Sequence, residues 1–138
     1  MALQQGATDA FKTGLMNGGY NFTSGSFKMA LYTGSATLGP STAVYTSTNE
    51  VVATGYTAGG IALPVSVAPT SSNNITYISF SNVTWYGSIT ARGALIYQSG
   101  GSNPTVCVLD FGSDKTSITS LTVQFPTADS ANAIIRIT

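Results

Sequence analysis

Acidic side chains are the residues of this sequence with the most catalytic potential, because it contains no histidine. Without histidine there is no Ser-His-Asp triad and no His-ligated metal. A small hydrolase would need two carboxylates flanking one cleft, and Glu50, Asp110 and Asp114 are the candidates. Their spacing places no two of them together, and calcium would need a denser acidic loop. The sequence therefore predicts a protein that is not an enzyme, with no catalytic, cofactor-binding or metal-binding residues.

The single cysteine and the glycine-rich segment also have non-catalytic interpretations. Cys107 lies in the apolar run Val106–Leu109, with no histidine, lysine or helix start beside it to activate a thiolate. We expect it to be an inert core residue. The segment Gly55–Gly60 lacks the lysine of a phosphate-binding loop and precedes a strand rather than a helix.

Aromatic side chains offer a binding chemistry that needs neither charge nor histidine. Tyr56, Trp85, Tyr86 and Tyr97 could form a platform on which sugar rings stack. Aromatic residues in strands more often pack in the core or pair across strands. Both interpretations remain open at the level of sequence.

Charge is scarce in this chain. It has 138 residues with zero net charge, and 7% of them are charged, against about 25% in ordinary globular proteins. A neutral surface excludes the electrostatic attraction that nucleic acids and anionic membranes require. The sequence has no apolar run of membrane-spanning length and no signal-peptide pattern, so we expect synthesis in a cytoplasm. Low charge also favours association with other proteins.

Most of the chain shows the alternation of apolar and polar residues that is typical of β-strands. Turn-forming segments separate these stretches, and Gly112–Lys115 is one of them. This pattern predicts an all-β fold, a single β-sandwich domain spanning residues 1–138 with about eight strands and a jelly-roll-like order. The expected strands are Phe27–Thr33, Thr42–Thr46, Ile61–Val67, Ile75–Trp85, Ile89–Tyr97, Thr105–Phe111, Ile118–Phe125 and Ala133–Thr138.

The same alternation predicts which side chains form the core. Ten of them should be mostly buried between two sheets: Phe27, Met29, Leu31, Ile78, Phe80, Leu95, Val106, Val108, Val123 and Ile135.

The N-terminal segment, residues 1–20, has a different pattern. Thr8 can cap a short helix that ends near Gly18, and a helix this short must dock on another surface to be stable. That surface is either the open end of its own sandwich or a neighbouring subunit. In the second case residues 1–20 form an arm whose contact residues are Leu3, Phe11, Leu15 and Met16.

A family resemblance rests on Phe27–Thr33, Asn49-Glu50, Gly55–Gly60, Trp85 and Ile89–Tyr97. Over this half of the chain the sequence resembles small virion proteins of tailed bacteriophages, and in particular capsid decoration (cement) proteins. The resemblance implies a β-sandwich or jelly-roll protein made in the host bacterial cytoplasm and bound to the capsid exterior. Its partner would be the major capsid protein, whose subunits it bridges, and the family has no catalytic residues to carry over.

Two further expectations go with this resemblance. Symmetry favours a homo-oligomer, with a dimer first. The alternative function is a tail or baseplate adhesion module that binds host-surface glycan through exposed aromatics.

Overall fold

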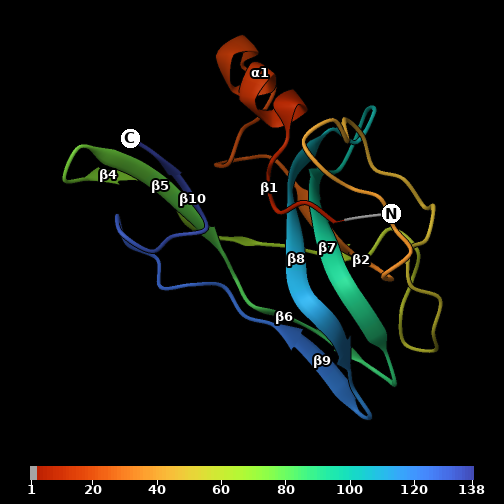
Figure 1. The fold of residues 1–138 in the computed structure, drawn as a ribbon. Helices are drawn as coiled ribbons and strands as arrows, with labels where there is room; N and C mark the ends of the chain where they lie inside the picture. The colour runs from red at the N-terminus through yellow and green to blue at the C-terminus, as the bar shows by residue number, and fades with distance from the viewer. Residues whose placement is uncertain (1–2) are drawn as a thin grey trace.

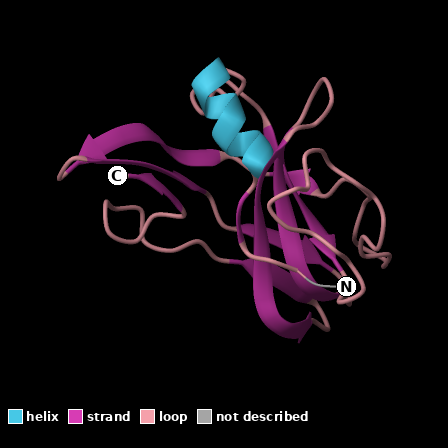
Figure 2. Cartoon of the chain, turned by 45° about the horizontal axis from the view of Figure 1, so that its top comes forward, coloured by secondary structure: helices cyan, strands magenta, loops and turns pink. Residues whose placement is uncertain are grey.

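The computed structural model describes residues 3–138, so residues 1 and 2 of the expected arm lie outside the described part. It is mostly β, with 45% strand and 7% helix, and its sheets are antiparallel (Figures 1 and 2). The elements are β1 (Gly6–Ala7), α1 (Asp9–Asn17), β2 (Phe27–Tyr32), β3 (Ile61–Ala62), β4 (Val65–Ser72), β5 (Ile75–Phe80), β6 (Val83–Tyr86), β7 (Thr90–Gln98), β8 (Thr105–Thr116), β9 (Ser120–Val123) and β10 (Ile135–Ile137).

A five-stranded sheet with the order β1-β8-β7-β2-β3 forms the centre of the molecule. Met29 of β2 lies opposite Ile96 of β7, and Leu31 lies opposite Ala94. Most residues of both strands are buried, including neighbours that point to opposite faces. Both faces of this sheet are therefore covered.

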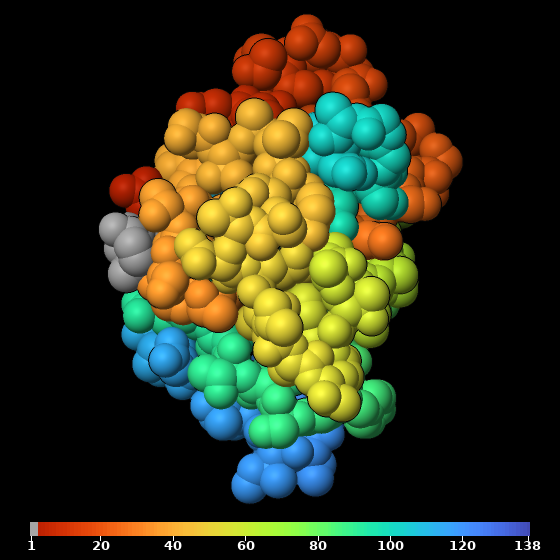
Figure 3. Space-filling model, turned by 90° about the vertical axis from the view of Figure 1, so that its right-hand side faces the viewer, coloured from red at the N-terminus to blue at the C-terminus, as the bar shows by residue number. Residues whose placement is uncertain are grey.

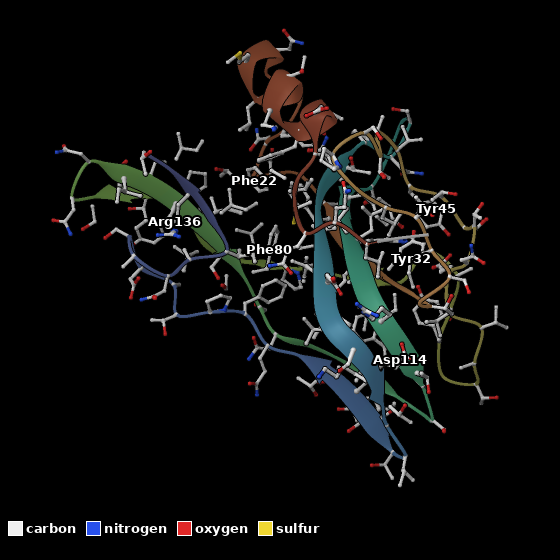
Figure 4. The ribbon with its side chains drawn as sticks, viewed as in Figure 1. Phe22, Tyr32, Tyr45, Phe80, Asp114 and Arg136 are labelled. Atoms are coloured by element: carbon white, nitrogen blue, oxygen red, sulfur yellow. The ribbon has the colours of Figure 1, made fainter. Side chains whose placement is uncertain are left out.

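One face packs against α1 and two smaller sheets, β10-β5-β4 and β6-β9. Aromatic rings fill the space between them, where Figure 4 shows Phe22 and Phe80. The Phe22 ring stacks on Phe27 with 4.7 Å between centroids, and the Phe27 and Phe80 rings meet edge to face at 5.8 Å. The all-β class is thus confirmed in its coarse form, as several antiparallel sheets with one short N-terminal helix.

The other face is covered by the segment from residue 33 to residue 60, here called the strap, which contains no regular strand. It runs across the sheet as the orange and yellow surface of Figure 3. Ala36 and Leu38 of the strap pack on Leu95 and Val108 of the central sheet. The prediction that all ten core residues lie between two sheets is thus wrong for Leu95 and Val108, which are buried beneath the strap.

Burial of the predicted core residues follows the sequence pattern. Nine of the ten are buried, and Ile135 at the edge of the outer sheet is half-buried.

Three expected strands are changed in the structure. The stretch Thr42–Thr46 makes only one bridge, between Val44 and Pro104, and Pro104 has no N–H to extend the ladder. Pro64 divides Ile61–Val67 into β3 and β4, and Ser81-Asn82 divides Ile75–Trp85 into β5 and β6. The strand order in these sheets does not show a jelly roll.

The expected N-terminal helix is present as α1. Thr8 is its N-cap and accepts a hydrogen bond of 3.2 Å from the Phe11 N–H, while Gly18 closes the helix in the left-handed conformation. Packing explains the glycine at position 14 of this helix, because a Cβ there would lie 2.3 Å from the Tyr20 ring.

Candidate functional site

The strap carries the most elaborate polar cluster of the described chain, centred on Glu50. Its carboxylate is buried and accepts hydrogen bonds from the Tyr45 hydroxyl at 2.6 Å, from the Gly59 N–H at 2.7 Å, and from the Tyr56 hydroxyl. Tyr56 also accepts a hydrogen bond of 2.9 Å from the Leu31 N–H of β2. Glu50 thereby joins three parts of the strap to one another, and Tyr56 connects this cluster to β2 of the central sheet.

Two more tyrosines extend this cluster. The Tyr97 hydroxyl donates to the Gly59 carbonyl at 2.6 Å, and the Tyr97 ring stacks on Tyr45 with 4.9 Å between centroids. Tyr32 donates to the Thr46 carbonyl at 2.5 Å. Figure 4 shows Tyr32 and Tyr45 on the strap side of the central sheet.

Burial determines the electrostatics of these tyrosines. Desolvation raises the pKa of Tyr32, Tyr45, Tyr56 and Tyr97 above the ordinary value, and the negative charge of Glu50 raises each of them further. The hydroxyls therefore stay protonated and donate hydrogen bonds. Because every group around Glu50 is a donor held in place, this arrangement fixes the strap rather than presenting a reactive carboxylate to solvent.

The glycine-rich end of the strap has a steric explanation. Gly60 has a φ of +85°, and a Cβ there would lie 1.8 Å from the Met29 carbonyl oxygen. The backbone of the strap can approach β2 this closely only with glycine at this position. The segment that superficially resembles a phosphate loop is a close backbone contact.

The three acidic residues considered for hydrolysis lie in different environments. Glu50 of the strap is buried, and Asp110 accepts a 3.0 Å ion-pair hydrogen bond from the Arg92 Nε. The Gly112 N–H and Arg92 hold the pKa of Asp110 below its usual range. Asp114 is exposed and lines a separate pocket. The structure does not bring these carboxylates together.

A β-bulge creates the pocket that contains Asp114. In the β7–β8 ladder Ala91 pairs with Lys115 and Gly93 pairs with Asp110, so residues 111–114 stand opposite Arg92 alone. The sequence predicted a turn at Gly112–Lys115, whereas the structure has a bulge there and ends β8 at Thr116, after which the chain enters β9 of a different sheet. Bulges re-aim side chains, and this one turns Asp114 toward the strap.

The pocket is open and has a volume of about 330 Å³. Its walls combine Asp114 and Arg92 with the Thr90 and Ser88 side chains and with the apolar strap segment 51–53. Figure 4 shows Asp114 near the end of β7 and β8 that lies farthest from α1.

Three apolar side chains are exposed beside this pocket. Val52 of the strap, Tyr86 at the end of β6 and Ile118 after β8 are 96%, 75% and 86% exposed. The segments that carry them meet, since the Gly87 N–H donates to the Thr119 carbonyl at 2.8 Å and a Cβ on Gly55 would overlap the Tyr86 carbonyl. We call Val52, Tyr86 and Ile118 the apolar end of the molecule.

The aromatic platform considered from the sequence is not assembled. Trp85 and Tyr97 are buried and Tyr56 is half-buried, which leaves Tyr86 as the only exposed member of the four.

Three of the four predicted arm residues contact the chain's own core. Phe11 is buried, Leu15 packs against the same cluster, and Leu3 packs against the cluster beneath the strap. Met16 is 91% exposed and free to contact a partner. Within this chain α1 is docked on its own domain, as in the first of the two sequence alternatives.

Cys107 occupies the environment that its sequence predicts. It is buried, and desolvation raises the pKa of its thiol to about 12.

Sequence reasoning missed Tyr32, Tyr45, Val52 and Ile118. A usable signal for the polar cluster was Glu50, a charged residue beside the apolar pair Val51-Val52 with tyrosines on both sides. Val52 and Ile118 carry a weaker signal, as large apolar residues flanked by turn-forming sequence.

Residues 3–138 contain no group of three or more acidic or cysteine side chains that could hold a metal ion. Within the same range, no helix has the length and hydrophobicity needed to span a bilayer. Comparisons with protein-family models, with curated proteins and with solved structures found no match to this chain.

Proposed function

We propose that this chain is a structural virion protein that binds the outside of a tailed-phage capsid and stabilises it by bridging major capsid protein subunits. The observation that carries the proposal is the apolar end, where Val52, Tyr86 and Ile118 are 75–96% exposed. Large apolar side chains grouped on a surface mark sites of protein association. The family resemblance supplies the identity of the partner.

The apolar end itself is uncharged, and the adjoining pocket holds one carboxylate and one guanidinium, Asp114 and Arg92. The segments that form the apolar end, residues 51–55, 86–88 and 116–120, contain no charged residue. The chain has zero net charge, so copies of it repel one another little and many molecules can lie close together on one particle. If each copy bridges subunits, the shell is stabilised by the summed binding free energy of many weak contacts.

Rigidity of the body also supports a bridging role. The central sheet is covered on both faces. Glu50 holds the strap together through three hydrogen bonds, and hydrogen bonds between Leu31 and Tyr56 and between Tyr97 and Gly59 join the strap to the sheet. A rigid body loses little conformational entropy on binding. The sandwich with a jelly-roll order, and a dimer on the particle, belong to this proposal as well.

The test is the copy number and position of the chain in purified virions. Gel densitometry should give a number of copies comparable to that of the major capsid protein, and cryo-electron microscopy should place them on the outside of the head. A few copies at the tail or baseplate would overturn the proposal and favour an adhesion role.

A further inference from the structure

The strand pairs β6-β9 and β7-β8 belong to different sheets, but together they form one continuous two-stranded ribbon with a bend. The last pair of β6-β9 is Tyr86 with Ser120. The first pair of β7-β8 is Thr90 with Thr116, four residues further along each strand (86 to 90 and 120 to 116), so the register is the same on both sides of the bend. The bend lies at the end of β7 and β8 that is farthest from α1 (Figure 1).

The side chain of Ser117 joins the two strands inside this bend. Across the bend the Gly87 N–H donates to the Thr119 carbonyl at 2.8 Å, and the Ser117 N–H donates to the Ile89 carbonyl at 2.8 Å. The Ser117 hydroxyl accepts a hydrogen bond of 3.1 Å from the Ile89 N–H and donates one of 2.8 Å to the Gly87 carbonyl. Ser117 and Ile89 are both buried, so water does not readily replace these hydrogen bonds.

The bend determines which side chains form the apolar end. Successive residues of a strand point to opposite sides, so the inward position of Ser117 turns its neighbour Ile118 outward. On the other strand, the exposed Tyr86 directly precedes Gly87. The strap contacts the bend as well, since a Cβ on Gly87 would lie 2.4 Å from the Thr54 carbonyl oxygen. The three segments of the apolar end therefore meet at the bend.

We propose that Ser117 is a positioning residue, whose hydroxyl holds the bend in the conformation in which the apolar end binds its partner. This inference rests on the proposed function and names the residue that preorganises its binding surface. Without the hydroxyl the buried Ile89 N–H loses its acceptor, which favours conformations in which the bend is open. If the binding conformation is then populated in about one molecule in ten, the apparent Kd rises about tenfold.

The first experiment measures binding of the purified protein to capsid shells assembled without it, by cosedimentation well below the melting temperature of each variant. Ser117→Ala removes the hydroxyl, and Ser113→Ala is the matched control, because Ser113 is exposed in β8. We expect Ser117→Ala to raise the Kd about tenfold and Ser113→Ala to bind as the wild type does. If Ser117→Ala does not fold, Ser117→Cys takes its place, since a thiol is a weaker hydrogen-bonding group than a hydroxyl.

A double-mutant cycle with Ile118→Ala separates positioning from a general loss of stability. Ile118→Ala removes one of the side chains that the bend positions. Adding Ser117→Ala to it should therefore raise the Kd by a smaller factor than Ser117→Ala does alone. Equal factors in the two backgrounds would overturn the positioning role.

Amide hydrogen exchange tests the bend without the capsid. In Ser117→Ala the N–H groups of residues 86–89 and 117–120 should exchange faster, while those of β2 keep the wild-type rate. Unchanged exchange at the bend would overturn the positioning role and leave the capsid role intact. A wild-type protein that does not bind the shells would overturn the capsid role, and the exchange rates would still decide whether Ser117 holds the bend.

Discussion

The Glu50 carboxylate accepts a 2.6 Å hydrogen bond from the Tyr45 hydroxyl, and both residues belong to the strap that covers the central sheet. Neither carboxylate oxygen meets a cation within residues 3–138, since both ion pairs there involve other residues. Hydrogen bonding alone therefore compensates the cost of burying this charge. The buried carboxylate therefore favours one arrangement of the strap, because any displacement of the strap would leave the charge without hydrogen-bond donors.

Replacing Glu50 by glutamine should therefore destabilise the protein in spite of the similar shape. The amide nitrogen would face a hydroxyl or N–H donor and leave a buried polar group unpaired, at a cost of about 1–3 kcal/mol. Urea unfolding of Glu50→Gln should show this loss. Asp9→Asn, which disrupts only an exposed ion pair, should stay within about 1 kcal/mol of wild type. A Glu50→Gln protein as stable as wild type would show that the carboxylate does not fix the strap.

Alkaline pH should destabilise the fold through the buried tyrosines. Their pKa values are raised in the folded state, so the unfolded chain releases its protons first, near pH 10. The stabilisation is then complete below about pH 10 and is lost as pH rises above it. The loss is up to about 1.4 kcal/mol per pH unit for the fully buried Tyr32, and it is smaller for the half-buried Tyr45 and Tyr56, whose charges solvent screens.

The measurement is the free energy of unfolding between pH 8 and pH 12, with tyrosinate absorbance followed in parallel. The absorbance of the cluster tyrosines should appear together with unfolding. Tyr45→Phe should lower the steepness of the stability decline, since it removes one of the shifted groups. A stability that does not change from pH 9 to pH 12 would contradict the assigned burial.

The sequence predicted the β class, the helix cap at Thr8 and most of the core, because these depend on local periodicity and capping chemistry. It did not predict the strap. Both faces of β2 are covered, so Ala30 and Tyr32 are as inaccessible as Met29 and Leu31. Alternation of apolar and polar residues identifies a strand with one buried face, and it does not predict that an irregular segment covers the other face.

The candidate site was less predictable than the fold for a related reason. Asp114 faces its pocket because four residues of β8 bulge opposite Arg92, and bulge position is a property of strand pairing rather than of local sequence. Glycine and aspartate at 112–114 indicated a break in the strand, but a turn and a bulge use the same residues.

Leu95→Ala should cost as much stability as Leu31→Ala, although the two side chains belong to different clusters. Both are fully buried, Leu31 toward the aromatic layer and Leu95 beneath the strap. Removing a buried leucine side chain costs about 2–5 kcal/mol. Val52→Ala, at the apolar end, should change stability by less than about 0.5 kcal/mol. A small effect of Leu95→Ala in chemical denaturation would mean that the strap does not seal this face.

Cys107 should react slowly with a thiol reagent in the native protein. Its side chain is buried, and the pKa of about 12 leaves almost no thiolate at pH 8. Ellman's reagent should label the protein only in denaturant. Rapid labelling of the native protein would indicate that the region around β8 opens readily.

Deletion of residues 1–19 distinguishes a docked helix from an arm that contacts a neighbouring subunit. The deletion removes Phe11 from the aromatic core, where its ring lies 5.1 Å from Tyr20 and 5.9 Å from Phe22. It also removes the buried Thr8 hydroxyl, which lies 2.9 Å from that of Thr105. Because losing Phe11 alone should cost about 3–5 kcal/mol, we expect the truncated protein to be unfolded or insoluble. Met16→Ser provides the matched control, since Met16 is exposed and its replacement should leave the melting temperature unchanged. If the truncated protein instead melts at the wild-type temperature but no longer coats capsids, the N-terminal segment acts as an arm and its docking on the core contributes little to stability.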